Sequence, residues 1–377
     1  MQMLIRPYSA DGGLLRSAIK HGATVGGIVL DAHTAKFARN AALETRERMP
    51  EGAEFLVDPV THKLQASFFR SKRRTYQRLP YYFTKRYGVR VPKNHELDDL
   101  AAAAADAVLG VQQEFGATAF LSPYLYVDTN CFVGSSTPTT FSVGVRWAEE
   151  FLKLTGNSNA YFSLCISAEC LTDPDALTEF AKAIRRLHAR QVYLLVTDFE
   201  LGENVTLDEG MRGFLQMLRE AGIERIVYSH APSWVYFLEP HGVNAFVSGI
   251  NYLSTLKQEY LTRKEDIGGI NHNYYVPRRF CRMTPAQATD AIDLGLIEPC
   301  ECPVCDGGVP DGTNAIREHY IHARAAECRE LHGAHRASDL LRRWVEETDE
   351  FLVDVDAQHL KVFGAPKPTL WAEMLPP

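Results

Sequence analysis

Three cysteines lie within six residues in the last quarter of the chain, in the order Cys300-Glu-Cys302-Pro-Val-Cys305. Thiols this close in sequence pair poorly with one another as disulfides, but all three can turn toward one tetrahedral metal ion. With a histidine as the fourth ligand, the spacing predicts a closed, structural zinc site. The alternative is a loop that carries three reduced cysteines and no metal.

Several histidines that could supply the fourth ligand follow the cysteines. We expect His332 to be the ligand, because the segment 329–344 around it could form an amphipathic helix with its leucines turned inward. His335, on the same segment, is the second choice. Two nearer histidines, His319 and His322, also compete for this place.

Acidic and polar side chains follow several short apolar runs. If these runs are parallel barrel strands, the residues after them gather at one end of the barrel. Two carboxyl groups about 5 Å apart are the usual device for breaking a glycosidic bond through a covalent intermediate. An aspartate at a strand end is also a common helix cap or loop hydrogen-bonding group, and this alternative stays open. The residues concerned are Asp31, Asp58, Ser122, Asp128, Glu169, Asp198, Glu200 and His230.

The apolar runs themselves indicate the fold. Most are followed by segments with helical spacing, such as 175–187 and 210–219. Alternation of strands and helices predicts an α/β protein with a (β/α)8 barrel in residues 1–290, followed by a zinc-binding C-terminal subdomain in 291–377. A doubly wound open sheet is the alternative, although no glycine-rich phosphate-binding motif follows any run. The runs are 2–8, 27–31, 54–58, 119–123, 161–166, 192–197, 225–229 and 245–249.

The composition is that of an enzyme-sized protein with a large apolar core. The chain has 377 residues, of which 46% are hydrophobic, and a formal net charge of −7. This charge argues against a protein that coats nucleic acid indiscriminately. No run reaches the roughly 18 apolar residues of a membrane span, and no secretory signal is recognisable. We therefore expect a cytoplasmic protein with reduced cysteines and no membrane partner.

Basic stretches interleaved with aromatic residues could bind a nucleic acid. Residues 69–78 carry five cationic side chains, among them Arg73 and Arg74, and the pattern continues in 84–93 and recurs in 277–282. Cationic side chains neutralise phosphates, and tyrosines stack on unpaired bases. The alternative is that these are solvated loops whose charges are balanced by nearby carboxylates.

A barrel-like chain with this cysteine motif resembles the tRNA-guanine transglycosylase superfamily, which includes the queuine and archaeosine enzymes and relatives that place 7-deazaguanines in DNA. The resemblance is also carried by Tyr-Ile-His at 320–322, by Leu-His at 331–332, by Tyr228-Ser-His-Ala-Pro232 and by the stretch 242–249. It implies a structural Zn²⁺ ion and guanine or a 7-deazapurine as the base. It also implies tRNA or DNA as the nucleic acid and suggests a homodimer.

The resemblance implies base exchange, in which an aspartate attacks the ribose C1′, expels guanine and holds a covalent nucleotide until the new base arrives. Asp58 matches the aspartate that handles the proton, and Ser122 stands where members have a base-recognising aspartate. The nucleophile position reads Val247, whose aliphatic side chain cannot form a glycosyl ester.

Two interpretations follow from the valine at the nucleophile position. Either another carboxylate attacks, with Asp31, Asp128 and Asp198 as the choices, or the chain is a non-catalytic accessory or nucleic-acid-binding subunit. A barrel hydrolase that acts on another N-glycoside is a third reading. In the enzyme reading, the substrate is bound by Ser122, His230, Arg73 and Arg74.

Overall fold

The computed structural model describes residues 1–7, 11–65, 75–81, 94–132, 139–156, 159–250, 256–262, 273–364 and 366–376, with the backbone alone at 94–99, 260 and 262. Parallel strands form a nearly closed barrel in the order β3-β2-β1-β9-β8-β7-β6-β4. The strands are β1 (Gln2–Arg6), β2 (Gly27–Asp31), β3 (Glu54–Asp58), β4 (Phe120–Leu121), β5 (Tyr126–Val127), β6 (Ala160–Ser167), β7 (Gln191–Thr197), β8 (Arg225–Ser229) and β9 (Val243–Gly249).

The barrel prediction is confirmed, because the two strands at the ends of this order, β3 and β4, contact each other. β1 lies in the middle of the order, between β2 and β9, in parallel register. β4 and β5 both pair with β6 and together fill one of eight positions around the barrel. Across the remaining gap, the Thr118 amide donates a hydrogen bond to the Phe55 carbonyl oxygen (2.9 Å).

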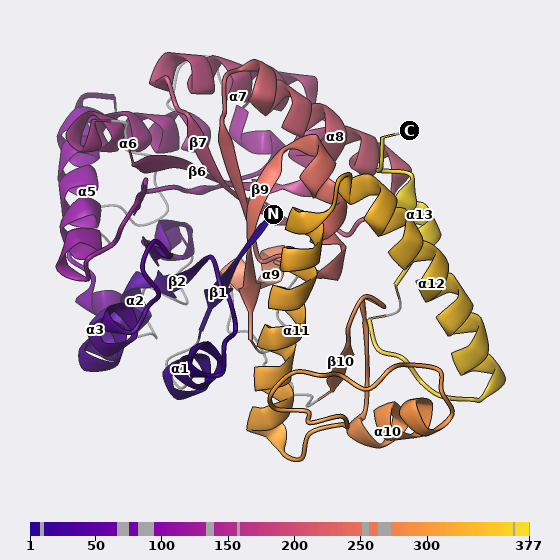
Figure 1. The fold of residues 1–377 in the computed structure, drawn as a ribbon. Coiled ribbons are helices and arrows are strands. Elements are labelled where there is room, and N and C mark those ends of the chain that lie inside the picture. Colours follow the sequence, from indigo (N-terminus) through magenta and orange to yellow (C-terminus); the bar gives the residue numbers. More distant parts are fainter. Residues whose placement is uncertain are drawn as a thin grey trace.

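Helices cover the outside of the barrel, as the alternation of the sequence predicts (Figure 1). The predicted helices at 175–187 and 210–219 are confirmed as parts of α7 and α8, and the Asp173 side chain caps α7 by accepting from the Ala176 amide (2.8 Å). The helices are α1 (Gly12–Lys20), α2 (Ala32–Phe37), α3 (Arg39–Glu47), α5 (Asn94–Glu114), α6 (Thr140–Thr155), α7 (Pro174–Leu187) and α8 (Val205–Glu220). Shorter 3-10 helices are η1 (Thr61–Gln65), η2 (Tyr76–Arg78), η3 (Thr129–Phe132), η4 (Ala168–Leu171) and η5 (Ser233–His241).

Alternate side chains of the strands fill the barrel interior, since successive residues of a strand point to opposite faces. At the amino-terminal end, Arg225 closes the interior by donating to the Tyr161 hydroxyl (2.7 Å) and to Glu54 (2.8 Å). The middle of the interior is mostly apolar, and on β6 it also holds the buried Ser163, between Tyr161 and Cys165. That middle is formed by Leu4, Val29, Leu56, Leu121, Tyr161, Cys165, Tyr193, Leu195, Val227, Ala245 and Val247.

The C-terminal segment adds a β-hairpin and further helices outside the barrel. α11 contacts α1 and β1, so it packs on the barrel itself, whereas β10, α10 and α12 lie farther out (Figure 1). The hairpin, α10 and the end of α12 share a separate apolar cluster that begins at Tyr274 and also includes Cys305. The elements are α9 (Gln258–Thr262), β10 (Tyr274–Val276), β11 (Cys281–Met283), α10 (Pro285–Asp293), α11 (Thr313–Gly333), α12 (Ala337–Ala357) and α13 (Pro368–Ala372).

The division at residue 290 that the sequence suggests runs through this second cluster. Hydrophobic side chains on both sides of it, such as Met283 and Ile297, pack together. No helix within the described parts of the chain has the length and apolar character needed to cross a membrane.

A buried arginine joins α11 to the barrel. The Arg324 guanidinium lies over the rings of Tyr236 (4.4 Å) and Phe246 (5.0 Å) and is fully buried. Its partner Glu327 accepts hydrogen bonds from the Tyr236 hydroxyl (2.8 Å) and the Tyr275 hydroxyl (2.9 Å). Because a buried ion pair that loses one partner leaves an uncompensated charge, this contact fixes the position of α11 on the barrel.

Gly27 shows how closely β2 and β3 approach each other. It pairs with Glu54, and a Cβ atom at this position would lie 2.3 Å from the Glu54 carbonyl oxygen. We expect Gly27→Ala to lower the free energy of unfolding by about 1–3 kcal/mol, because the strand must shift to relieve this overlap. Gly213→Ala on α8, where nothing lies within 4 Å, should be neutral or slightly stabilising. Urea unfolding of both variants measures the effect, and equal stability of Gly27→Ala and the parent would contradict it.

Candidate metal centre and barrel mouth

Four side chains of the C-terminal segment converge as a metal-ligand cluster. The ligand atoms of Cys300, Cys302, Cys305 and His319 all lie within 4.8 Å of one another. His319 Nδ1 is 3.1 Å from the Cys305 sulfur and 3.6 Å from the Cys302 sulfur. Three thiolates and one imidazole are the ligand set of closed, tetrahedral metal sites. The predicted cysteine cluster is therefore confirmed as a group that could hold a metal ion.

The fourth member of this cluster is His319, and the prediction of His332 is wrong. Both histidines lie on α11, which runs without a break from Thr313 to Gly333. His332 is thirteen residues farther along, about 20 Å away at the helical rise, and its side chain is exposed. His335 is exposed beyond the end of the helix, and His322 lies beside Glu318 at 4.0 Å. The expected helix start near 329 is instead the last turn of a longer helix.

The imidazole of His319 is held by the hairpin on its far side. Nε2 donates to the Tyr275 carbonyl oxygen (2.8 Å), which leaves Nδ1 free to face the thiols. The ring of Tyr274 stacks on the imidazole with centroids 4.2 Å apart and planes 8° from parallel. Such outer contacts fix the orientation and the tautomer of a ligating histidine. The cluster therefore ties the loop 300–308 to α11 and to β10.

At the opposite end of the barrel from Arg225, an arginine occupies the mouth. Arg6, the last residue of β1, forms ion pairs with Asp31 and with Asp58, the latter at 2.7 Å. Its guanidinium also donates to the Tyr193 hydroxyl and to the Ser229 hydroxyl (3.3 Å). Asp31 and Asp58 end neighbouring strands and are register partners. The two carboxylates thus converge on one cation, and sequence reasoning missed this cation although it too follows an apolar run.

Asp58 is buried behind this cation and its oxygens are occupied. The side chain has no exposed surface. Oδ1 accepts from the Val60 amide (2.8 Å) and from the Tyr124 hydroxyl (2.7 Å), and Oδ2 accepts from Arg6. With so many donors around it, Asp58 is placed to orient Arg6 and Tyr124.

Asp31 differs from Asp58 because its side chain is partly exposed. Oδ1 accepts from Arg6, the side chain is 17% exposed, and Oδ2 has His33 Nδ1 at 4.0 Å. Although Asp31 precedes α2, its carboxylate does not cap that helix. Burial raises the pKa of Asp31, but the charges of Arg6 and Lys63 outweigh burial and hold the pKa below its ordinary value. Burial lowers the pKa of His33 to about 4, so this imidazole is neutral at pH 7. Asp31 is therefore an ionised, partly accessible carboxylate.

The other aspartates predicted as catalytic act as caps. Asp128 accepts from the Asn130 amide (3.1 Å) and so closes the first turn of η3. Asp198 is exposed, has a positive φ of 57°, and accepts from the Gln258 amide (3.0 Å) at the start of α9. Neither carboxylate lies with Asp31 in the group around Arg6, as the helix-cap alternative anticipates.

The predicted substrate-binding residues fall in different places. Ser122 is fully buried and accepts from the Ser163 amide (3.0 Å), so it joins β4 to β6. His230 follows β8 at the mouth with a positive φ of 56°. Arg73 and Arg74 lie outside the described residues. Val247 points into the apolar middle of the barrel, where its Cα pairs with those of Leu4 and Ser229.

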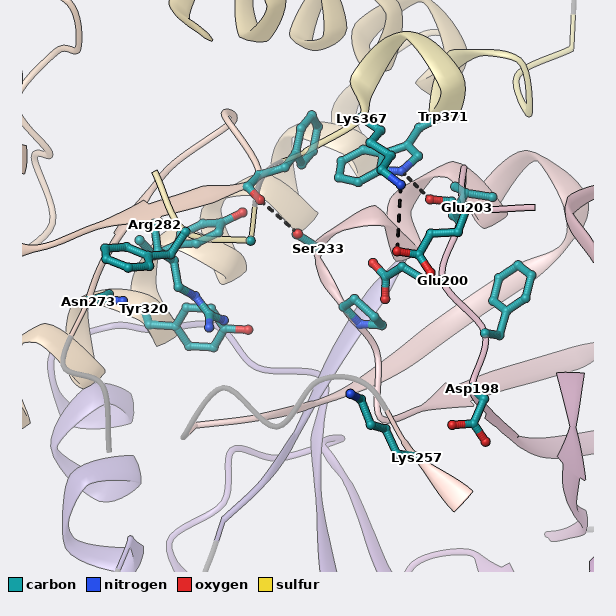
Figure 2. A pocket seen from close by; sticks show the side chains of 17 residues that line it. Asp198, Glu200, Glu203, Ser233, Lys257, Asn273, Arg282, Tyr320, Lys367 and Trp371 are labelled. Atoms are coloured by element: carbon teal, nitrogen blue, oxygen red, sulfur yellow. Dashed lines mark hydrogen bonds and ion pairs between the residues drawn. The ribbon is translucent and has the colours of Figure 1, made fainter. Parts of the chain in front are cut away.

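A polar cavity of about 750 Å³ lies at the same end of the barrel, between the loops after β7 and β8 and the C-terminal segment. Figure 2 shows Arg282, Asn273 and Tyr320 on one side of it and Glu200 and Glu203 on the other. The Glu200 carboxylate accepts from the Trp234 indole N–H (2.8 Å). A volume of this size accommodates a small organic ligand.

Comparison of the sequence with family models and curated proteins assigns no family to the chain. Neither the family models nor the curated protein sequences searched contain a match to the chain. The barrel alone does not determine a reaction, because such barrels carry many unrelated chemistries. What the protein does has to follow from its mouth residues, its metal-ligand cluster and its cavity.

The metal-ligand cluster predicts that metal binding depends on His319 and does not depend on His332. His319→Ala should lose the bound metal and melt at a lower temperature, because a structural metal contributes folding free energy. His332→Ala on the same helix should keep about one ion per chain. Elemental mass spectrometry and thermal unfolding of both variants measure this. Metal loss in His332→Ala with retention in His319→Ala would contradict the assignment.

The arginine at the mouth predicts a pH-dependent stability. Arg6→Met leaves two carboxylates beside an apolar side chain and should cost about 3–5 kcal/mol at pH 7. Because the folded-state pKa of Asp31 lies below its ordinary value of 3.8, the ion pair stabilises the protein above that pH. Its contribution is lost as the pH falls through the folded-state pKa, so the difference between variant and parent should shrink there.

Denaturant unfolding at several pH values measures this difference. Arg16→Met serves as the control, because Arg16 forms a half-exposed ion pair with Glu44 (3.6 Å) whose loss costs about 1 kcal/mol or less. A cost for Arg6→Met that equals the control, or that grows on acidification, would show that Arg6 does not hold the two carboxylates.

Proposed function

We propose that this chain is a base-exchange enzyme similar to the tRNA-guanine transglycosylases, acting on guanine or a 7-deazaguanine in tRNA or DNA. The observation that carries the proposal is the pair of carboxylates, Asp31 and Asp58, that converge on Arg6 at the barrel mouth. At the position where the resemblance implies the nucleophilic aspartate, this chain has Val247. In the proposed reaction Asp31 attacks instead. Asp31 has a partly exposed side chain and a lowered pKa, which suit a nucleophile.

The proposed reaction proceeds in two displacements. The Asp31 carboxylate attacks the ribose C1′, the C1′–N bond breaks, and the departing base takes the bonding electron pair and a proton from solvent water. The ring nitrogen of the incoming base then attacks C1′, loses its proton to solvent water, and releases the Asp31 carboxylate. One glycosidic bond replaces another, so the exchange needs no external energy source.

Arg6 suits this sequence of steps electrostatically. In the resting site, two carboxylates share one guanidinium. When Asp31 becomes a neutral ester, Arg6 remains paired with Asp58, so the buried site passes from a net negative charge to balance. A buried cation without a partner would be costly, and Asp58 prevents this. The position of Asp58 behind Arg6 therefore supports a role in keeping the nucleophile oriented.

We infer that the cluster of three cysteines and His319 holds Zn²⁺. All four tetrahedral positions would be filled by protein atoms, which is typical of structural rather than catalytic zinc. The ion would then stabilise the loop 300–308 against α11 and take no part in the displacement.

A second candidate function is a non-catalytic, nucleic-acid-binding subunit. The apolar Val247 at the expected nucleophile position favours it. So does the full set of hydrogen bonds around Asp58, which leaves this carboxylate without an accessible oxygen.

Transfer of labelled guanine, or of a labelled 7-deazaguanine, into tRNA and into duplex DNA separates the two candidates. We expect exchange by the parent with one of these nucleic acids, and a loss of about a thousandfold or more in Asp31→Asn, since an amide cannot act as the nucleophile. Asp128→Asn, which alters only a turn cap, is the matched control and should retain exchange. Exchange that survives Asp31→Asn would exclude Asp31 as nucleophile. No exchange by a folded, metal-loaded parent would favour the subunit.

A further inference from the structure

The cavity beside the barrel mouth has a cationic side. Arg282 of β11 forms this side, and its guanidinium lies over the ring of Tyr320 at 5.4 Å; Lys257 before α9 also lines the cavity and lies below Glu200 in Figure 2. Figure 2 shows Arg282, Tyr320 and Asn273 grouped on this side. An arginine supported by an aromatic ring presents its donors in a fixed plane, which suits the oxygens of a phosphate.

The facing side carries carboxylates. Glu200 and Glu203 lie across the cavity from Arg282, and Asp198 lies below them in Figure 2. Lys367 lies 3.7 Å from Glu203, which offsets one of these charges. Carboxylate oxygens accept hydrogen bonds from N–H groups, such as those on the pairing edge of guanine. The cavity thus offers a cation for one end of a ligand and acceptors for the other.

We propose that this cavity is a binding subsite for a nucleoside phosphate, separate from the Arg6 site. Arg282 and Lys257 would bind the phosphate, and Asp198 and Glu200 would face the donor edge of the base. The volume of about 750 Å³ fits one nucleotide unit. The proposal rests on the proposed function only in that it takes the ligand to be a nucleotide, either free or within a polynucleotide chain.

The metal-ligand cluster builds one wall of this subsite. His319 donates to the carbonyl oxygen of Tyr275, which lines the cavity, and the next residue on α11, Tyr320, lines it as well. Tyr275 is the register partner of Arg282 in the hairpin. The rings of Tyr275 and Tyr320 meet edge to face at 5.3 Å. A metal ion that fixes His319 therefore also fixes the side chains around Arg282, so loss of metal should weaken phosphate binding.

Two probes test the subsite in the metal-loaded protein: guanosine 5′-monophosphate by calorimetry, and a fluorescein-labelled single-stranded oligonucleotide by polarisation. Arg282→Gln and Lys257→Gln should each weaken binding about tenfold or more and flatten the dependence of affinity on salt. Arg278→Gln is the matched control, because Arg278 belongs to the same hairpin turn but pairs with Glu330 on the surface (2.6 Å). It should bind as the parent does.

The two probes also identify the source of the phosphate. Comparable affinity for both supports a free nucleotide, and binding of the oligonucleotide alone supports a polynucleotide. Parent-like affinity and salt dependence in both Arg282→Gln and Lys257→Gln would overturn the subsite.

Removal of the metal tests whether the metal-ligand cluster supports the subsite. Chelation should reduce the affinity for both probes by about the same factor as Arg282→Gln, while circular dichroism shows the barrel intact. Unchanged affinity after complete metal loss would overturn the link between the cluster and the subsite. Asp31→Asn should bind both probes normally, so a failure of base exchange and a failure of this subsite give different results.

Discussion

The architecture of the barrel mouth depends on one buried cation, the guanidinium of Arg6. A charge at the end of β1 inside a barrel is tolerated only if carboxylates reach it, and neighbouring strands β2 and β3 each end in one, Asp31 and Asp58. Because β1 lies between β2 and β9, the same strand also joins the first strands of the chain to the last. Hydroxyl groups from β7 and β8 complete the contacts across the interior. The pairing of the strands therefore brings the carboxylates to Arg6, and the ion pairs in turn stabilise the arrangement of the strands.

The segment that carries the metal-ligand cluster depends on the barrel in a comparable way. α11 carries His319 and, less than two turns farther along, the buried Arg324. One helix therefore belongs both to the metal-ligand cluster and to the contact with the barrel. The hairpin is held from both sides, by His319 at the Tyr275 carbonyl and by Glu327 at the Tyr275 hydroxyl. The hairpin in turn places Arg282 at the cavity. A structural metal in this position would support the shape of the mouth as well as the stability of the segment.

The strands could be predicted from the sequence because each is a short apolar run with polar residues at its end, and each of the eight runs overlaps a barrel strand. The cysteine ligands could be recognised from the sequence because they lie within six residues of one another, so no knowledge of the tertiary structure is needed to group them. The fourth ligand could not, because spacing alone does not reveal that 313–333 is a single helix, which removes His332 from the cluster. Arg6 was missed because its role depends on a register between strands distant in sequence. Asp31 and Asp128 look alike in sequence, and only their contacts in the fold separate them, an ion pair with Arg6 for Asp31 and a cap bond for Asp128.

The claim that Asp31 is the attacking group is tested most directly by trapping the covalent intermediate. The protein would be incubated with guanine-containing tRNA or DNA without an acceptor base, digested, and its peptides sequenced by mass spectrometry. We expect an abasic sugar phosphate attached through C1′ to the peptide that contains Asp31, and none in Asp31→Asn. An adduct on a different carboxylate, or exchange without any adduct on Asp31, would contradict it.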